Sequence, residues 1–99
     1  MDILSNKLDC IKKQPGLYIS KKSLILLKAY IDGYIERQNE LNNNYDLGFY
    51  PGFQEYIQTR FNIKSSHNWA DIINFFSTTE EEAFDRFYVL LEGFLKNEI

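Results

Sequence analysis

Apolar residues recur with helical spacing along most of this chain. In the N-terminal segment, the apolar face consists of Ile3, Leu4, Leu8 and Ile11. This spacing predicts a short helix. Pro15 and Gly16 are expected to end it, because proline disfavours helical geometry in Gln14 and glycine permits a turn. Residues 17–19 are then predicted to be extended, with Ser20 as the N-cap of the next helix.

The longest predicted helix follows Ser20. Its apolar stripe consists of Leu24, Leu27, Ile31, Tyr34 and Ile35. The polar side carries Lys28, Asp32 and Glu36. Gly33 lies inside this helix, where glycine costs about 1 kcal/mol relative to alanine, so close approach by another helix is expected there. The three asparagines at 42–44 are expected to end the helix, because asparagine competes for backbone hydrogen bonds.

Two shorter helices are predicted in the middle of the chain. Residues 47–52 are expected to form a structured loop, with Phe49 and Tyr50 as anchors. The helix after it has an apolar face of Phe53, Tyr56, Ile57 and Phe61. The next apolar face consists of Trp69, Ile72, Ile73 and Phe76, and Asn68 or Ser66 is the expected N-cap.

The last helix has the clearest start signal. Thr78 with Glu81, or Thr79 with Glu82, has the spacing of a capping box, and three glutamates complement the positive end of the helix dipole. Its apolar face consists of Ala83, Phe87, Leu90, Leu91 and Phe94. No stretch alternates over a strand length, so residues 1–99 are predicted to form one all-α domain of about five helices.

Composition fits a single domain with an aromatic core. The 99 residues are 44% hydrophobic and 16% aromatic. The formal net charge of 11 − 14 = −3 argues against general affinity for nucleic acid phosphates. Charge is unevenly placed: residues 1–28 carry +4, residues 29–79 carry −3 and residues 80–99 carry −4. These charges are either ordinary solvated helix faces or an acidic surface that meets a basic partner.

The location expected from the sequence is cytoplasmic. Cys10 is the single cysteine, so no internal disulfide can form, which fits a reducing compartment. The N-terminal residues lack the pattern of a secretory signal. The apolar run at 24–27 is far too short to span a bilayer, so we expect no membrane partner.

Few residues are suited to catalysis or metal binding. His67 is the only histidine, and nucleophilic catalysis would have to pair it with Cys10 through the tertiary fold and add a third orienting group. A structural zinc site uses four Cys or His ligands, and this chain has two such residues. Glu80, Glu81 and Glu82 splay around a helix start, so they do not converge on one atom. We therefore expect no enzyme activity, metal, cofactor or small-molecule substrate.

Two features leave alternatives open. Lysine pairs at 12–13 and 21–22 flank Tyr18, either as a small nucleic-acid patch or as a solvated basic edge facing the acidic C-terminal helix; the second is favoured. Tyr45, Phe49 and Tyr50 lie in a loop and are either a core plug or a contact patch, since tyrosine is enriched at protein interfaces.

An ordered series of turns and aromatic residues gives the chain a family resemblance. The series runs P-G-L-Y-I (15–19), S-L (23–24), L-x-A-Y-I-D-G-Y (27–34), F-Y-P-G-F-Q-E-Y-I (49–57), W-A-D-I-I-x-F (69–75) and E-E-A-F-D-R-F-Y-x-L-L-E-G-F (81–94). It resembles small bacterial immunity proteins of contact-dependent growth inhibition and related polymorphic toxin systems. In those proteins the first motif of the series is commonly R-P-G-M-Y, so Gln14 and Leu17 depart from the pattern. Gln14 stands in place of the arginine and lacks its positive charge.

The resemblance implies a non-catalytic inhibitor that binds one cognate toxin domain. The expected toxin is a nuclease, and more specifically an RNase, with the RNase A-like kind as the candidate. The resemblance transfers no catalytic residue, and Pro15, Gly16 and Tyr18 are interpreted as structural.

The acidic side chains are the predicted partner-binding residues, because a nuclease site is lined with cations and complementary charge gives steering and specificity. The first group is Glu80, Glu81, Glu82 and Asp85. The second group is Asp32, Glu36, Glu40 and Asp46, with Tyr45 and Tyr50 as aromatic anchors. The alternatives are a helical adaptor or regulator without a toxin partner, a small nucleic-acid-binding regulator that uses the lysine-rich first third, and, with least support, an enzyme.

Overall fold

The computed structural model describes residues 3–41, 50 and 52–96, which form six helices and no strand. The helices are α1 (Ile3–Lys13), α2 (Pro15–Tyr18), α3 (Leu24–Leu41), α4 (Phe53–Arg60), α5 (Trp69–Phe75) and α6 (Glu80–Lys96). The all-α prediction is therefore confirmed. The expected helix end at 42–44 and the loop anchor Phe49 lie outside the described residues.

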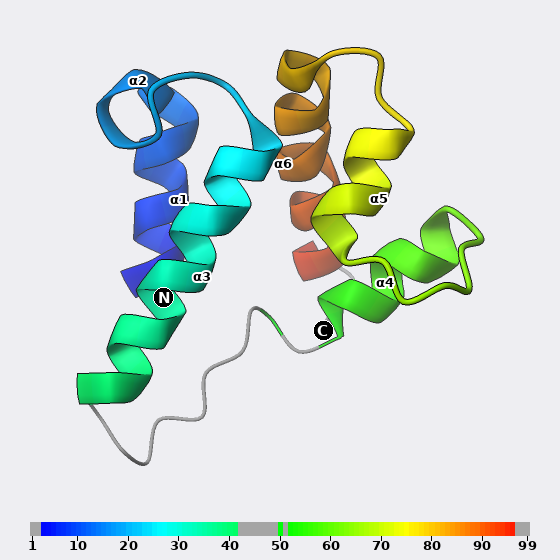
Figure 1. Ribbon diagram of the computed structural model, residues 1–99, viewed down its shortest axis with the longest axis horizontal. Helices are drawn as coiled ribbons and strands as arrows, with labels where there is room; N and C mark the ends of the chain where they lie inside the picture. The colour runs from blue at the N-terminus through cyan, green and yellow to red at the C-terminus, as the bar shows by residue number, and fades with distance from the viewer. Residues whose placement is uncertain (1–2, 42–49, 51, 97–99) are drawn as a thin grey trace.

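Helices α3, α5 and α6 contact one another and form the centre of the fold. Helix α4 packs against α5 and α6 at one end of the molecule, and α1 with α2 lies at the other (Figure 1). Helix α6 contributes the most to the core, because both its apolar face and its neighbouring positions are covered. Its buried residues are Ala83, Phe84, Phe87, Tyr88, Leu90, Leu91 and Phe94.

Aromatic rings fill the centre of the core. The ring of Phe53 lies edge-on to those of Trp69, Phe87 and Phe94, with centroid separations of 5.4, 6.0 and 5.4 Å. Edge-to-face pairs of this kind add stabilisation beyond the apolar area that they bury. The expected apolar faces of α3 and α4 also reach this core, through Leu24, Leu27, Ile31, Phe53 and Ile57.

The start of α3 differs from the prediction. Residues 15–18 form the short helix α2 instead of an extended segment, with the amide of Ile19 donating to the carbonyl of Pro15 at 2.8 Å. Proline at the first helical position is pre-organised for a helix, which explains the difference. Ser20 has a φ of 76° and is not the cap. The N-cap of α3 is the buried residue Ser23, whose Oγ accepts a hydrogen bond from the Leu26 amide at 3.3 Å.

Two other expectations about packing are wrong. Among the described residues, a Cβ added at Gly33 would meet nothing within 4 Å, so no described helix approaches this glycine, which lies on the exposed side of α3. Phe76 is not a core residue, because its side chain is 41% exposed. It follows the last turn of α5, where the chain leaves the core.

The predicted caps of the two C-terminal helices are largely confirmed. Asn68 caps α5, accepting from the amide of Asp71 at 2.8 Å. Thr79 caps α6, accepting from the amide of Glu82 at 3.0 Å. The Glu82 carboxylate does not return to Thr79, however, but accepts from the amide and the hydroxyl of Thr78. The return hydrogen bond of the capping box is therefore made to Thr78, one residue before the N-cap Thr79.

Candidate partner-binding surface

The acids at the start of α6 are mostly paired within the chain. Glu80 forms an ion pair with Lys21 at 3.5 Å, and Asp85 forms one with Lys22 at 2.8 Å. The lysine edge therefore faces the acidic helix, as predicted. These side chains remain 39–62% exposed, and exposed ion pairs are worth only about 0–1 kcal/mol. A cationic partner can therefore replace the lysines at small cost.

Glu82 and Glu81 differ in how they are held. The Glu82 carboxylate accepts two hydrogen bonds from Thr78 and lies 3.8 Å from Arg86. The Thr78 amide is the main reason that the pKa of Glu82 lies below its usual range, which keeps this carboxylate ionised. Glu81 is exposed and forms no ion pair with any described residue. Of the first group, Glu81 alone has a carboxylate without such a partner in the described part of the chain.

The second acidic group forms a stripe on α3. Asp32, Glu36 and Glu40 are four residues apart, so they share one helix face, and all three are exposed. Together with Ile35 and Asn39 they line a shallow hollow of about 450 Å³. Asp32 pairs with Lys28 at 2.6 Å and Glu40 with Arg37 at 3.3 Å. Glu36 makes no ion pair within the described ranges.

The structure does not merge the two acidic groups into one site. The first group lies at the start of α6, whereas the stripe lies on the second half of α3, which extends towards the opposite end (Figure 1). Within the described residues, no set of three or more Cys, His, Asp or Glu side chains could hold a metal ion. Both groups are thus anionic surfaces with outward-facing charge.

The predicted aromatic anchors are only partly described. Tyr45 and Asp46 lie outside the described residues. Tyr50 is half-buried and packs against the hydrophobic core. Its side chain lines a hollow of about 340 Å³ beside α1 and α6, with Tyr88 among the other lining residues. For Tyr50, partial burial favours the core-plug alternative over a free contact patch.

A larger hollow, which the sequence pattern did not identify, lies beside α5. We call it the aromatic hollow; its volume is about 550 Å³ and its lining is Ile63, Ser65, His67, Asp71, Ile72, Asn74, Phe75 and Phe76. Phe75 is 80% exposed. The available signal was Phe75, which lies outside the apolar face of Trp69, Ile72, Ile73 and Phe76 that the helical spacing predicts.

The loop between α4 and α5, which forms one wall of the aromatic hollow, is fixed by two glutamines of α4. The amide nitrogen of Gln54 donates to the carbonyl of His67 at 2.8 Å, and that of Gln58 donates to the carbonyl of Ser65 at 2.8 Å. The Gln54 oxygen also accepts from the amide of Trp69 at 2.7 Å. Spacing along the chain did not predict these contacts, because they join α4 to the loop and to the start of α5, 7 to 15 positions away.

His67 has a nucleophile beside it, but not the one considered from the sequence. The Ser65 Oγ and the His67 Nδ1 are 2.6 Å apart. Cys10 lies on α1, at the other end of the molecule (Figure 1). The carboxylate of Asp71 accepts a hydrogen bond from the side-chain Nδ2 of Asn68 at 3.1 Å. In the described part of the chain, no carboxylate bonds the imidazole, so the third element of a catalytic triad is missing there.

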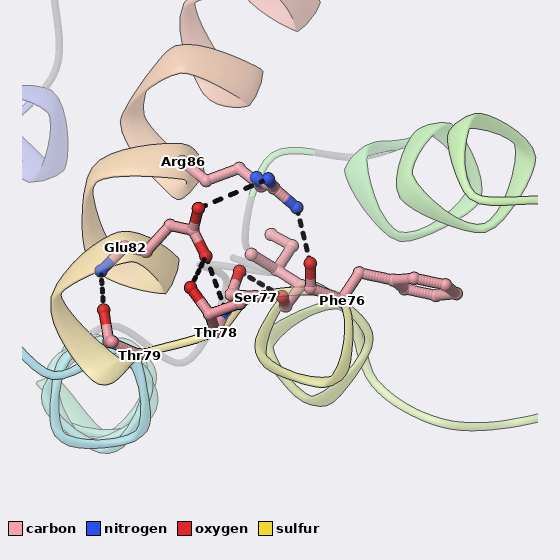
Figure 2. A network of polar contacts seen from close by, with 7 residues as sticks. Phe76, Ser77, Thr78, Thr79, Glu82 and Arg86 are labelled. Carbon is pink, nitrogen blue, oxygen red and sulfur yellow. Dashed lines mark hydrogen bonds and ion pairs between the residues drawn. The ribbon is translucent and has the colours of Figure 1, made fainter.

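A polar network fixes the end of α5 against α6. Figure 2 shows the guanidinium of Arg86 between the carboxylate of Glu82 and the carbonyl of Phe76, to which it donates at 2.8 Å. The Ser77 hydroxyl donates to the carbonyl of Ile73 at 2.7 Å. The Phe76 ring points away from this network. The backbone that carries the two exposed phenylalanines is therefore held from both sides.

Comparison with known proteins adds no relative to this description. No family model matches the chain, and neither a curated protein nor a solved structure matches it. None of the helices in the described ranges has the length and apolarity needed to cross a bilayer. The function is therefore inferred from the surfaces themselves and from the resemblance given above.

Proposed function

We propose that this chain is an immunity protein that binds a cognate bacterial toxin domain and neutralises it without catalysis. The proposed toxin is a nuclease, most specifically an RNase of the RNase A-like kind. The observation that carries the proposal is the acidic stripe of Asp32, Glu36 and Glu40, which is exposed beside a shallow hollow. The ordered turn and aromatic motifs shared with immunity proteins supply the class of partner.

Electrostatics supports this assignment. The residues after position 28 carry a formal charge of (−3) + (−4) = −7. A nuclease holds its substrate phosphates with cations, so an acidic protein surface can cover that site, accelerate association and disfavour wrong partners. The acids of α6 can join this contact, because their pairs with Lys21 and Lys22 are exposed and weak.

The proposed site of action is the cytoplasm of the producing cell. An RNase toxin meets its RNA substrates there, so an inhibitor has to be present in the same compartment. The single cysteine is compatible with that reducing environment.

Co-expression with the toxin tests the proposal. The candidate partner is the C-terminal domain encoded by the gene immediately upstream. We expect that domain to stop growth when expressed alone, that co-expression of this chain restores growth, and that the two proteins co-purify. Absence of both protection and binding would contradict the proposal and favour the adaptor alternative.

Charge reversal then tests the acidic surface. The Glu36→Lys, Glu40→Lys double variant should reduce protection and weaken binding, with a stronger effect at low salt. Glu81→Lys with Asp85→Lys tests the α6 group in the same way. Glu55→Lys on α4 is the matched control, since Glu55 is exposed and outside both groups. Unchanged protection by both double variants would exclude acidic coverage of the toxin.

A further inference from the structure

Building on the proposed function, we propose that the aromatic hollow is the surface that anchors the toxin. Its occupant is an apolar side chain of the toxin domain, bordered by lysine or arginine. Asp71, which lines the hollow, supplies negative charge at this contact, whereas the exposed ring of Phe75 supplies the apolar centre.

Three aromatic rings lead from the protein interior to the surface of the hollow. Phe61, half-buried after α4, stacks on Phe76 with ring centroids 5.0 Å apart. Phe76 in turn meets Phe75 edge-on at 5.1 Å. The ring of Phe75 is therefore supported from below while remaining 80% exposed. Exposed apolar residues are ordinary when isolated, but a supported and contiguous aromatic surface is typical of a contact site.

The walls of the hollow are already ordered. Gln54 and Gln58 hold the loop carbonyls of His67 and Ser65, and Arg86 holds the carbonyl of Phe76. Binding at a pre-ordered surface avoids the cost of immobilising loops and side chains. Rigid aromatic residues at such surfaces carry much of the binding energy of protein interfaces.

The charge around the hollow selects a cationic partner. Residues 65–85 contain five acids and no lysine or arginine. Glu80, Glu82 and Asp85 are paired with cations outside this segment, whereas Asp71 and Glu81 form no ion pair with a described residue. Asp71 lines the hollow, and Glu81 is exposed at the start of the next helix. Of the nearest cations, Lys64 is exposed beside the hollow, while Arg86 is occupied by Glu82 and the carbonyl of Phe76. A basic nuclease domain offers the complementary charge.

The same charge argues against a second copy of this chain as occupant. A two-fold dimer through the hollow would bring two copies of the same face against each other, each with the acids Asp71 and Glu81, which form no ion pair with a described residue. Like charges facing each other across an interface are unfavourable. The hollow is therefore better suited to a different, basic protein.

The test compares two apolar residues that are both mostly exposed. Phe75→Ser changes the hollow, and Leu17→Ser, at a residue 73% exposed on α2, is the matched control. Both should fold, as checked by circular dichroism, because neither residue is in the core. We expect Phe75→Ser to weaken toxin binding about tenfold or more in calorimetry, and Leu17→Ser to leave it unchanged. Hydrogen exchange should also show toxin-dependent protection of residues 63–76.

The outcomes separate this inference from the proposed function. The anchor is elsewhere if the toxin binds both variants as tightly as wild type, or if bound toxin does not slow hydrogen exchange in residues 63–76. The immunity function stands in both cases. If wild type fails to bind the toxin, the proposed function itself fails. A wild-type dimer that Phe75→Ser converts to a monomer, with unchanged toxin affinity, would assign the hollow to self-association and overturn the inference.

Discussion

The hydroxyl of Tyr88 on α6 donates a 2.8 Å hydrogen bond to the carbonyl oxygen of Leu8 on α1, across 80 positions of sequence. The Nζ of Lys12 lies 5.6 Å from the centroid of the same ring. Tyr88 therefore fastens the first helix to the last with a buried polar contact and a cation–π contact. Tyr88 was not among the residues of the apolar face predicted for this helix, and the fold shows both its burial and its polar role.

Replacing this hydroxyl should lower stability. Tyr88→Phe keeps the ring and removes the bond to Leu8, so we expect the free energy of unfolding to fall by about 1 kcal/mol. Urea unfolding at neutral pH measures this change. Tyr30→Phe, at a half-buried tyrosine on α3, is the control. An equal loss in both variants would mean that the Leu8 contact contributes nothing specific.

The same residue should make stability depend on alkaline pH. Burial, with a smaller contribution from the charge of Asp9, raises the pKa of Tyr88 well above its ordinary value. In the unfolded chain tyrosine ionises near pH 10. The contribution of protonated Tyr88 to the free energy of unfolding is therefore fully present below about pH 10. It is lost as the pH rises from there towards the pKa of Tyr88 in the folded protein. Unfolding measured at pH 8 and pH 10.5 should show a smaller alkaline loss for Tyr88→Phe than for wild type.

Two glycines should respond to alanine in opposite directions. Gly33→Ala should stabilise the protein by about 0.5–1 kcal/mol, because the added Cβ meets nothing within 4 Å and alanine favours the helix. Gly52→Ala should destabilise it by about 1–2 kcal/mol, because Gly52 has a φ of 91° before α4. Thermal unfolding distinguishes the two. A destabilising Gly33→Ala would mean that a contact at Gly33 had been missed.

The cap of α6 should contribute measurably to stability. Thr79→Ala removes the acceptor for the amide of Glu82 and should cost about 1 kcal/mol. Thr59→Ala on α4 is the control, because Thr59 is exposed within a helix. Urea unfolding of the two variants gives the comparison. If Thr79→Ala costs no more than Thr59→Ala, the start of α6 is held by its packing alone.

The ion pair between Lys22 and Asp85 should be weak. Both side chains are more than one-third exposed, so a double-mutant cycle with Lys22→Met and Asp85→Asn should give a coupling of about 0.2–1 kcal/mol that decreases in 1 M salt. A coupling well above this range, or one insensitive to salt, would show a structural bond too strong for a partner to displace.

The elements of the fold were largely readable from local patterns. The caps at Asn68 and Thr79 and the apolar face of α6 depend on residues within one or two helical turns, so their spacing was sufficient. The short helix α2 was missed because Pro15-Gly16 signals both a turn and a helix start, and local preference does not separate them.

The candidate surfaces were predictable only as residue types. The sequence favoured a lysine edge that faces the acidic C-terminal helix. It did not show that Lys21 pairs with Glu80 and Lys22 with Asp85, because those contacts join positions 59 and 63 apart. The aromatic hollow was missed for the same reason. Its walls depend on Gln54 and Gln58 reaching across from α4, and its floor on Phe61 stacking with Phe76.

The sequence by itself therefore determined the helices other than α2, most of their caps and the apolar faces that form the core, because these follow from periodicity and local hydrogen bonding. The tertiary structure decided which charges are paired and which remain available, and it left Phe75 exposed while burying Tyr88. Those outcomes depend on how distant helices meet. A helical pattern fixes the direction of a side chain around its own axis, but not what lies opposite it.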